Sequence, residues 1–187
     1  MAIANYVKVC EKNVPGVNSL FYTEVGNIDT VTITDGEITA VTMGTATNFF
    51  HEFDADIDSI EYSWEGKGSK NYFGKQTLEA GFSKLTKDLL TAKKSLVDAI
   101  NCGMIPIWID GNSQAWMGWN DSEKAKRPWN NIEDTFKTGK KPSDEDGGIF
   151  VITISGETGY DATPFNAALT ASIIAEATAA SLFIDFN

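Results

Sequence analysis

The segment LTKDLLTAKKSLVDAINC, residues 85–102, decides the fold class of this chain. Its apolar residues recur at a spacing of about 3.6 and predict an amphipathic helix with one buried stripe. Thr86 is a suitable N-cap, and Gly103 is a suitable C-terminal stop. The face opposite the stripe carries Lys87, Lys93 and Lys94, which we expect to point outward. The stripe itself consists of Leu85, Leu89, Ala92, Leu96, Ala99 and Ile100.

Residues 29–41 predict a β-hairpin. Apolar and polar side chains alternate around Asp35-Gly36, a dipeptide that favours a two-residue type I′ turn. Such a turn is expected to pair Ile33 with Ile38 and Val31 with Ala40 on one face.

Most of the remaining chain has strand and turn patterns. Residues 48–53, 57–64, 72–82 and 149–155 predict strands, and residues 105–119 predict a second hairpin with Ile105, Ile107 and Ile109 on one face. Residues 121–148 predict a long charged loop, and the tail from Asn166 is compatible with a helix or an added strand. The predicted fold is therefore mainly β: a β-sandwich or half-barrel of antiparallel strands flanked by one α-helix. We expect one domain over residues 1–166 and a C-terminal extension over 167–187.

The composition limits the function classes. The chain has 187 residues, a formal net charge of −11 and a sequence pI of about 4.5. Such acidity opposes direct wrapping of DNA, and it suits either simple solubility or a surface past which a polyanion slides. Cys10 and Cys102 form neither a disulfide framework nor a zinc pattern, which fits a reducing compartment. No signal peptide is expected, and residues 165–186 are too interrupted by polar side chains to predict a membrane span.

Single residues give little support for catalysis or metal binding. His51 is the only histidine, and we expect it to be structural or on the surface. Asp54, Asp56 and Asp58 alternate as in a calcium loop, but the sixth position is Ser59 where the EF-hand pattern needs glycine. In a strand, the same spacing places the three acids on one solvated face. We therefore favour an acidic face over a metal site.

Tryptophans are concentrated in the second half of the chain. One interpretation is an aromatic platform for sugar rings, as in a carbohydrate-binding adhesin module. The other is a mixture of core and subunit interface, where tryptophan is enriched. We favour the second. The residues concerned are Trp108, Trp116, Trp119 and Trp129.

The order of these elements resembles a known fold. The chain runs hairpin, long strand pair, helix, hairpin, long loop and strand, and this order is similar to that of the phage tail-tube proteins. Several stretches also resemble virion structural proteins of phages infecting Bacteroidota, over about residues 18–166. These stretches are NFFHEF (48–53), YFGKQTL (72–78) with FSKL (82–85), IWIDG (107–111) with WMGW (116–119), and GIFVITISG (148–156) before Pro164-Phe165.

The resemblance implies a structural role without catalysis, cofactor or metal. The expected assembly is a ring, typically hexameric, that stacks into a tail tube in the virion after assembly in the cytoplasm of the bacterial host. Its expected partners are copies of itself, other tail or connector proteins and the phage DNA passing through, with no membrane. A head–tail connector ring is the alternative within the same class. Candidate contacts between subunits or rings are Lys67, Ser69, Lys70, Trp129 and Phe136, and candidate lumen acids are Asp54, Asp56 and Asp58.

Overall fold

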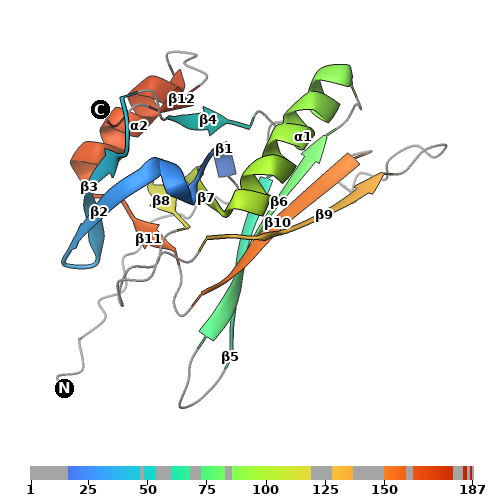
Figure 1. Cartoon of the computed structure of the whole chain (residues 1–187). Coiled ribbons are helices and arrows are strands. Elements are labelled where there is room, and N and C mark those ends of the chain that lie inside the picture. Colours follow the sequence, from blue (N-terminus) through green and yellow to red (C-terminus); the bar gives the residue numbers. More distant parts are fainter. Residues whose placement is uncertain are drawn as a thin grey trace.

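The protein is mainly β, as the sequence predicts. In the described residues, twelve strands form a ten-stranded sheet and a separate two-stranded hairpin, accompanied by two α-helices (Figure 1). The computed structural model describes residues 17–46, 49–53, 60–67, 73–82, 86–118, 128–136, 150–158, 162–178, 183–184 and 186.

The strands are short at the β11 end of the large sheet and in its β4–β12 branch. The helices are α1 (Lys87–Cys102) and α2 (Ala167–Thr178), and a 3₁₀ turn spans Val25–Asn27. The strands are β1 (Val17–Glu24), β2 (Ile28–Thr34), β3 (Glu37–Met43), β4 (Phe50–Glu52), β5 (Ile60–Lys67), β6 (Phe73–Phe82), β7 (Met104–Asp110), β8 (Ala115–Met117), β9 (Asn131–Phe136), β10 (Phe150–Thr158), β11 (Thr163–Pro164) and β12 (Phe183–Ile184).

Strand β1 is the branch point of the sheet. Its one edge pairs with β7 along the whole strand, while its other edge pairs with β5 at Val17 and with β4 at Phe21 and Tyr22. All these pairings are antiparallel, and the full order is β11-β8-β7-β1-β5-β6-β10-β9, with β4 and β12 on a side branch. The branch bends the sheet, so that β5, β6, β10 and β9 form a long arm below α1 (Figure 1).

Two cores lie on opposite faces of β1 and β7. The helix-side core takes Met104 and Trp108 from β7, and the hairpin-side core takes Ile105, Ile107 and Ile109. Successive side chains of a strand point to opposite faces, so a strand buried on both sides reads as a continuous apolar run. The predicted grouping of the three isoleucines on one face is confirmed.

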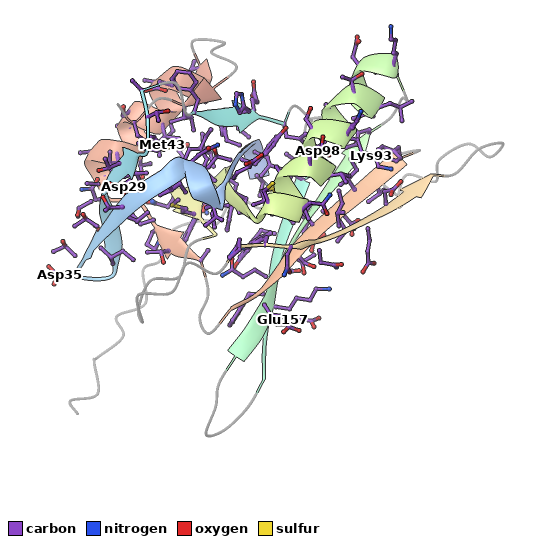
Figure 2. The ribbon with its side chains drawn as sticks, in the orientation of Figure 1. Asp29, Asp35, Met43, Lys93, Asp98 and Glu157 are labelled. Carbon is purple, nitrogen blue, oxygen red and sulfur yellow. The ribbon has the colours of Figure 1, made fainter. Side chains whose placement is uncertain are left out.

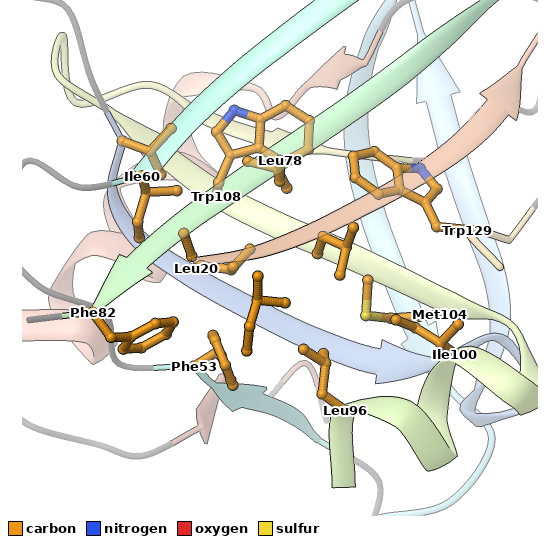
Figure 3. Close-up of a cluster of buried hydrophobic side chains, with 14 of the residues drawn as sticks. Leu20, Phe53, Ile60, Leu78, Phe82, Leu96, Ile100, Met104, Trp108 and Trp129 are labelled. Atoms are coloured by element: carbon orange, nitrogen blue, oxygen red, sulfur yellow. The ribbon is translucent and has the colours of Figure 1, made fainter. Parts of the chain in front are cut away.

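The helix-side core lies between α1 and the long arm (Figure 3). Leu96 and Ile100 of α1 are buried against this core, and Thr86 caps the helix by accepting a hydrogen bond of 3.1 Å from the Leu89 amide. Gly103 ends the helix with a φ of 87°, as the sequence predicts. Lys93 departs from the predicted outward face, because its Nζ forms an ion pair of 2.5 Å with Asp134 of β9.

The β2–β3 hairpin covers the hairpin-side core. Asp35 and Gly36 have φ values of 54° and 85°, which is the geometry of the predicted turn. Ile33 pairs with Ile38 as predicted, but Val31 pairs with Val41 and not with Ala40. The register shifts by one residue between Thr32 and Ile33 and shifts back between Ile28 and Thr30, so only Thr30, Val31 and Thr32 pair one residue away from the predicted register.

The C-terminal segment completes the hairpin-side core. Ile173 of α2 and Ile184 of β12 are fully buried there, and β12 adds to β4 as a strand. Phe186 packs its ring against Phe50 and Phe165, with centroid distances of 5.6 Å and 6.1 Å. The described residues of the C-terminal extension expected over 167–187 therefore pack into the hairpin-side core.

The region predicted as one long loop contains a strand. Residues 131–136 form β9, which pairs with β10 over six residue pairs, and Trp129 bridges to Met104 just before it. Residues 121–127 and 137–148 of this region lie outside the described part of the chain. β9 has two adjacent acids, Glu133 and Asp134, and a single aliphatic residue, Ile132, so the strand has a weak apolar pattern.

Candidate functional site: the acidic face of the four-stranded arm

The candidate site is the face of the arm that points away from α1. β6 and β10 form the centre of the arm, and β5 and β9 form its two outer strands. Residues with even numbers on these strands point to the helix side, where Leu78, Ile152 and Ile154 are fully buried. The residues with odd numbers on these strands form the opposite face, which we call the acidic face.

The register of the four strands arranges the acidic face in rows. One row carries Glu61, Glu79, Thr153 and Glu133, and the next carries Ser63, Thr77, Ser155 and Asn131. A third row carries Glu65, Lys75 and Glu157. Glu157 lies on the lower half of the arm, away from α1 (Figure 2).

The described side chains of this face are five glutamates, one lysine, neutral polar residues and Val151. All five glutamates are exposed, and Lys75 is the one basic residue among them. Glu61 and Glu79 lie directly opposite each other on β5 and β6, an arrangement that is destabilising for like charges. These two exposed side chains therefore repel each other across the strand pair.

Polar contacts order the β9 side of the face. The Asn131 side chain donates to Ser155 Oγ at 3.2 Å and to Glu133 Oε1 at 3.3 Å. On the helix side of the same strand, Asp134 is held by Lys93, whose Nζ also lies 5.5 Å from the centre of the Phe150 ring. These contacts hold β9, although it is an outer strand.

The outer edges of the arm differ from the edge of the hairpin. In the described residues, β9 pairs only with β10, and β5 pairs with β6 along its length and with β1 at one residue. Neither the β5–β6 nor the β9–β10 ladder has a register shift, whereas the β2–β3 ladder has two. Bulges protect an edge from further pairing, so the regular edges of the arm are better suited to accept another strand.

Most of the predicted contact and lumen residues lie outside the described residues. This holds for Ser69, Lys70 and the three acids Asp54, Asp56 and Asp58. The backbone of Lys67 ends β5 opposite Phe73, and the backbone of Phe136 pairs with Phe150. The predictions for these residues therefore stay predictions.

Trp129 does not lie on a surface that another subunit can contact. Its side chain is 0% exposed, and its ring centre lies 6.3 Å from that of Trp108 in the helix-side core. A Cβ at Gly118 or Gly156 would come within 2.9 Å or 2.7 Å of the indole, so both glycines are needed for its packing. The prediction that Trp129 contacts another subunit is therefore wrong. The other interpretation of the sequence, that this tryptophan belongs to the core, is confirmed.

Sequence reasoning missed the acidic face itself. The segment EYSWEGK in β5 places Glu61, Ser63 and Glu65 at every second position, and β6 continues the pattern with Lys75 and Glu79. This period-two signal was present, but it becomes a surface only when the register aligns strands that are distant in sequence. The pairing of β10 with both β6 and β9 depends on contacts that no local pattern contains.

The remaining candidates do not form a catalytic or metal centre. His51 is exposed on β4, with its ring centre 6.4 Å from that of Tyr22. Burial raises the pKa of the Tyr22 phenol, because the charged form loses its hydration. Among the described residues, no three His, Cys, Asp or Glu side chains are placed to hold a metal ion. None of the helices described here combines the length and the apolar character that a membrane crossing needs.

A functional argument for this chain depends on its fold and on the acidic face. No protein-family model, no curated protein and no solved structure matches the chain.

Proposed function

We propose that this protein is a non-enzymatic structural protein of a phage virion, which assembles with copies of itself into closed rings that form a tail tube. DNA would pass through the channel without sequence-specific binding, and other tail or connector proteins would contact the ends of the tube. The observation that carries the proposal is the four-stranded arm, with its acidic outward face and its two regular outer edges.

The direction of the outer strands suits ring closure. Every neighbouring pair in the arm is antiparallel, and the number of strands is even, so β5 and β9 run in opposite directions. The β9 edge of one copy can therefore pair with the β5 edge of the next copy and continue the antiparallel pattern. Such head-to-tail contacts produce a closed ring when successive rotations add up to a full turn, and a closed ring leaves neither edge of the arm exposed.

The chemistry of the acidic face suits a channel for a polyanion. A surface rich in Glu repels phosphate groups, and a DNA-binding surface would need Lys and Arg in their place. With the acidic face toward the lumen, α1 lies on the outside of the ring, because it packs on the opposite face of the arm. The charge that costs stability within one copy would then lower the adhesion of passing DNA.

The proposal of a sugar-binding module has less support. An aromatic platform needs exposed rings, and Trp129 is buried. Trp116 is half-buried on β8, where its Nε1 donates to Asp110 Oδ2 at 2.9 Å. The described acidic face carries no aromatic side chain on which a sugar could stack.

Cross-linking between edge strands tests ring closure. Ser63 and Asn131 end the same row on the two outer strands, so Ser63→Cys with Asn131→Cys should link neighbouring copies under mild oxidation. Ser63→Cys with Glu133→Cys tests the adjacent register, and both variants also carry Cys10→Ser and Cys102→Ser. We expect a ladder of covalent multimers that stops at the ring size, and rings or tubes by negative-stain microscopy.

Each outcome of this experiment is informative. Single-cysteine variants serve as controls and should form no ladder beyond dimers. Stacked rings support the tail tube, and isolated rings support the head–tail connector in its place. A monomer at all concentrations, with no ladder from either double variant, would refute the proposal.

Charge reversal tests the lumen. Glu61→Lys with Glu79→Lys should leave rings that retain double-stranded DNA at low salt, whereas wild-type rings should not. The control is Asp29→Lys with Glu37→Lys on the β2–β3 hairpin, which changes the net charge equally. Equal DNA retention by both variants would contradict the placement of the acidic face in the channel.

A further inference from the structure

The outer part of the arm has a composition that does not favour a stable sheet. It consists of residues 64–67 of β5, 73–76 of β6 and 156–158 of β10, and it extends away from α1 (Figure 1). These segments contain three glycines and no aliphatic residue. Glycine inside a strand weakens it, because it has no side chain to pack and loses much conformational freedom on folding. The pairing nevertheless continues here without a register shift, so other contacts hold the strands together.

An indole ring takes the place of a side chain on β6. Trp64 of β5 pairs with Gln76, so Gly74 is its diagonal neighbour on the helix side of the arm. A Cβ at Gly74 would lie 2.5 Å from Cη2 and 2.7 Å from Cζ2 of this indole, so the ring packs directly on the glycine backbone. The same Cβ would lie 2.5 Å from the main-chain oxygen of Glu65, so the two strands also approach closely. An aromatic ring over a glycine of the neighbouring strand offsets the missing side chain.

A second indole covers a glycine on the next strand. A Cβ at Gly156 of β10 would lie 2.7 Å from Trp129 Cδ1 and 2.8 Å from Cγ. Trp129 precedes β9, and its main chain forms two hydrogen bonds with that of Met104 on β7, of 2.7 Å and 2.9 Å. This tryptophan therefore connects the outer part of the arm with a central strand of the sheet.

The two indoles lie on either side of a buried glutamine. Gln76 pairs with Trp64 on β5 and with Gly156 on β10, and Trp129 packs on that glycine. The glutamine is 0% exposed, although it is polar and lies in the outer part of the arm. We call Trp64, Gln76 and Trp129 the tryptophan layer. This layer continues the helix-side packing into a part of the sheet that has no aliphatic side chains of its own.

The tryptophan layer opposes local opening of the arm. Strands open at little cost where few apolar contacts hold them, and glycine gains more freedom on opening than other residues. Opening of the outer part would separate both indoles from the glycine backbones and would expose Gln76 to water. The layer therefore stiffens a part of the sheet that its composition would leave loose.

We propose that Trp64 and Trp129 are positioning residues for assembly, which hold the outer part of the arm in one conformation so that neighbouring copies join in one geometry. This inference rests on the proposed ring and adds to it the contacts that keep its shape constant. Every contact in a ring repeats the same rotation between copies. A flexible arm would allow several rotations, and the products would be rings of several sizes or open chains.

Amide hydrogen exchange, at protein concentrations too low for assembly, tests the tryptophan layer itself. Gly74→Ala displaces the indole and should increase the exchange rates within 64–67 and 73–76 by about tenfold or more, while exchange in α1 stays unchanged. Trp64→Leu removes the ring without adding a methyl group to β6, and it should increase the same rates, which keeps the test valid if Gly74→Ala does not fold. Gly26→Ala is the matched control, because no other part of the described chain lies within 4 Å of its added Cβ, and it should leave these rates unchanged.

The size of the assembled rings tests the positioning role. Wild-type rings should have one size by negative-stain microscopy and by mass measurement in solution. Gly74→Ala and Trp64→Leu should give a spread of sizes or open chains. Thr86→Ala lowers stability at the cap of α1 and should keep the wild-type size, so a general loss of stability can be told apart from a change in the shape of the arm.

The outcomes separate this inference from the proposed ring. Unchanged exchange in both Gly74→Ala and Trp64→Leu would overturn the stiffening by the tryptophan layer and leave the ring untouched. Faster exchange combined with the wild-type ring size would overturn the positioning role alone. Absence of wild-type assembly would overturn the ring and, with it, the positioning role, whatever the exchange rates.

Discussion

The burial of Trp129 gives a sharp prediction, because a surface contact and a core residue respond differently to truncation. The indole packs between Gly118 and Gly156 and beside Trp108, with 0% of the side chain exposed. A buried tryptophan removes roughly 150–250 Å² from water, which corresponds to about 4–6 kcal/mol at ~25 cal/mol per Å². This value is an upper bound, because unfolded chains already bury part of their apolar surface.

We expect Trp129→Ala to lower the free energy of unfolding by about 3–5 kcal/mol. A domain of this kind has a total stability of roughly 5–15 kcal/mol, so the loss is a large fraction of it. Urea unfolding followed by far-UV circular dichroism measures the change, at protein concentrations too low for assembly. The slope of the unfolding free energy against urea should stay the same, since the fold is unaltered.

Two further variants test whether the lost stability comes from the buried ring of Trp129. Trp129→Phe keeps an aromatic ring and removes a buried Nε1–H that has no acceptor among the described residues, so its loss should be about 1 kcal/mol or less. Leu90→Ala is the exposed control, with a change within about 0.5 kcal/mol. A loss below about 1 kcal/mol for Trp129→Ala, combined with loss of assembly, would refute the core assignment and restore the surface contact.

Three other changes test separate parts of the structure. Thr86→Ala removes the N-cap of α1 and should lower the unfolding free energy by about 1 kcal/mol in urea titrations. Glu79→Gln removes the repulsion from Glu61 and should raise the midpoint of urea unfolding. Salt screens this repulsion, so the gain should be smaller in about 0.5 M NaCl than at low salt. An equal gain at both salt concentrations would contradict the electrostatic cause. Burial raises the pKa of the Tyr22 phenol above its ordinary value of 10.0, so ionising this group costs more in the folded than in the unfolded protein. The wild type should therefore lose stability as the pH rises above 10.0. Tyr22→Phe should lose less stability over the same pH range, as measured by thermal unfolding at a series of pH values.

Local chemistry was sufficient for most individual elements. The spacing of Leu96 and Ile100 defined α1, and Thr86 and Gly103 defined its ends, because caps act within one helical turn. Asp35-Gly36 defined its hairpin for the same reason, since both residues accept the positive φ values of the turn. The acidity that argues against DNA binding also follows from composition alone.

Non-local contacts decided the rest. β9 has one aliphatic side chain, and it is a strand because β10 aligns it and Lys93 of α1 neutralises Asp134. The C-terminal segment has small and mixed side chains, and its position depends on the hairpin-side core that Ile173 and Ile184 complete. Trp129 could be assigned to the core only when Gly118 and Gly156, distant in sequence, were seen to frame it.

The sequence by itself determined the helix, the Asp35-Gly36 hairpin, the mainly β fold class and the negative charge, because each depends on neighbours in the chain or on composition. Only the tertiary structure decided which residues share a surface. The register of β5, β6, β10 and β9 brings the glutamates of four separate segments into rows, and it places Trp64, Gln76 and Gly156 side by side on the opposite face. Strand pairing is a long-range contact whose alignment depends on the whole core, so neither the acidic face nor the tryptophan layer could be located from local patterns.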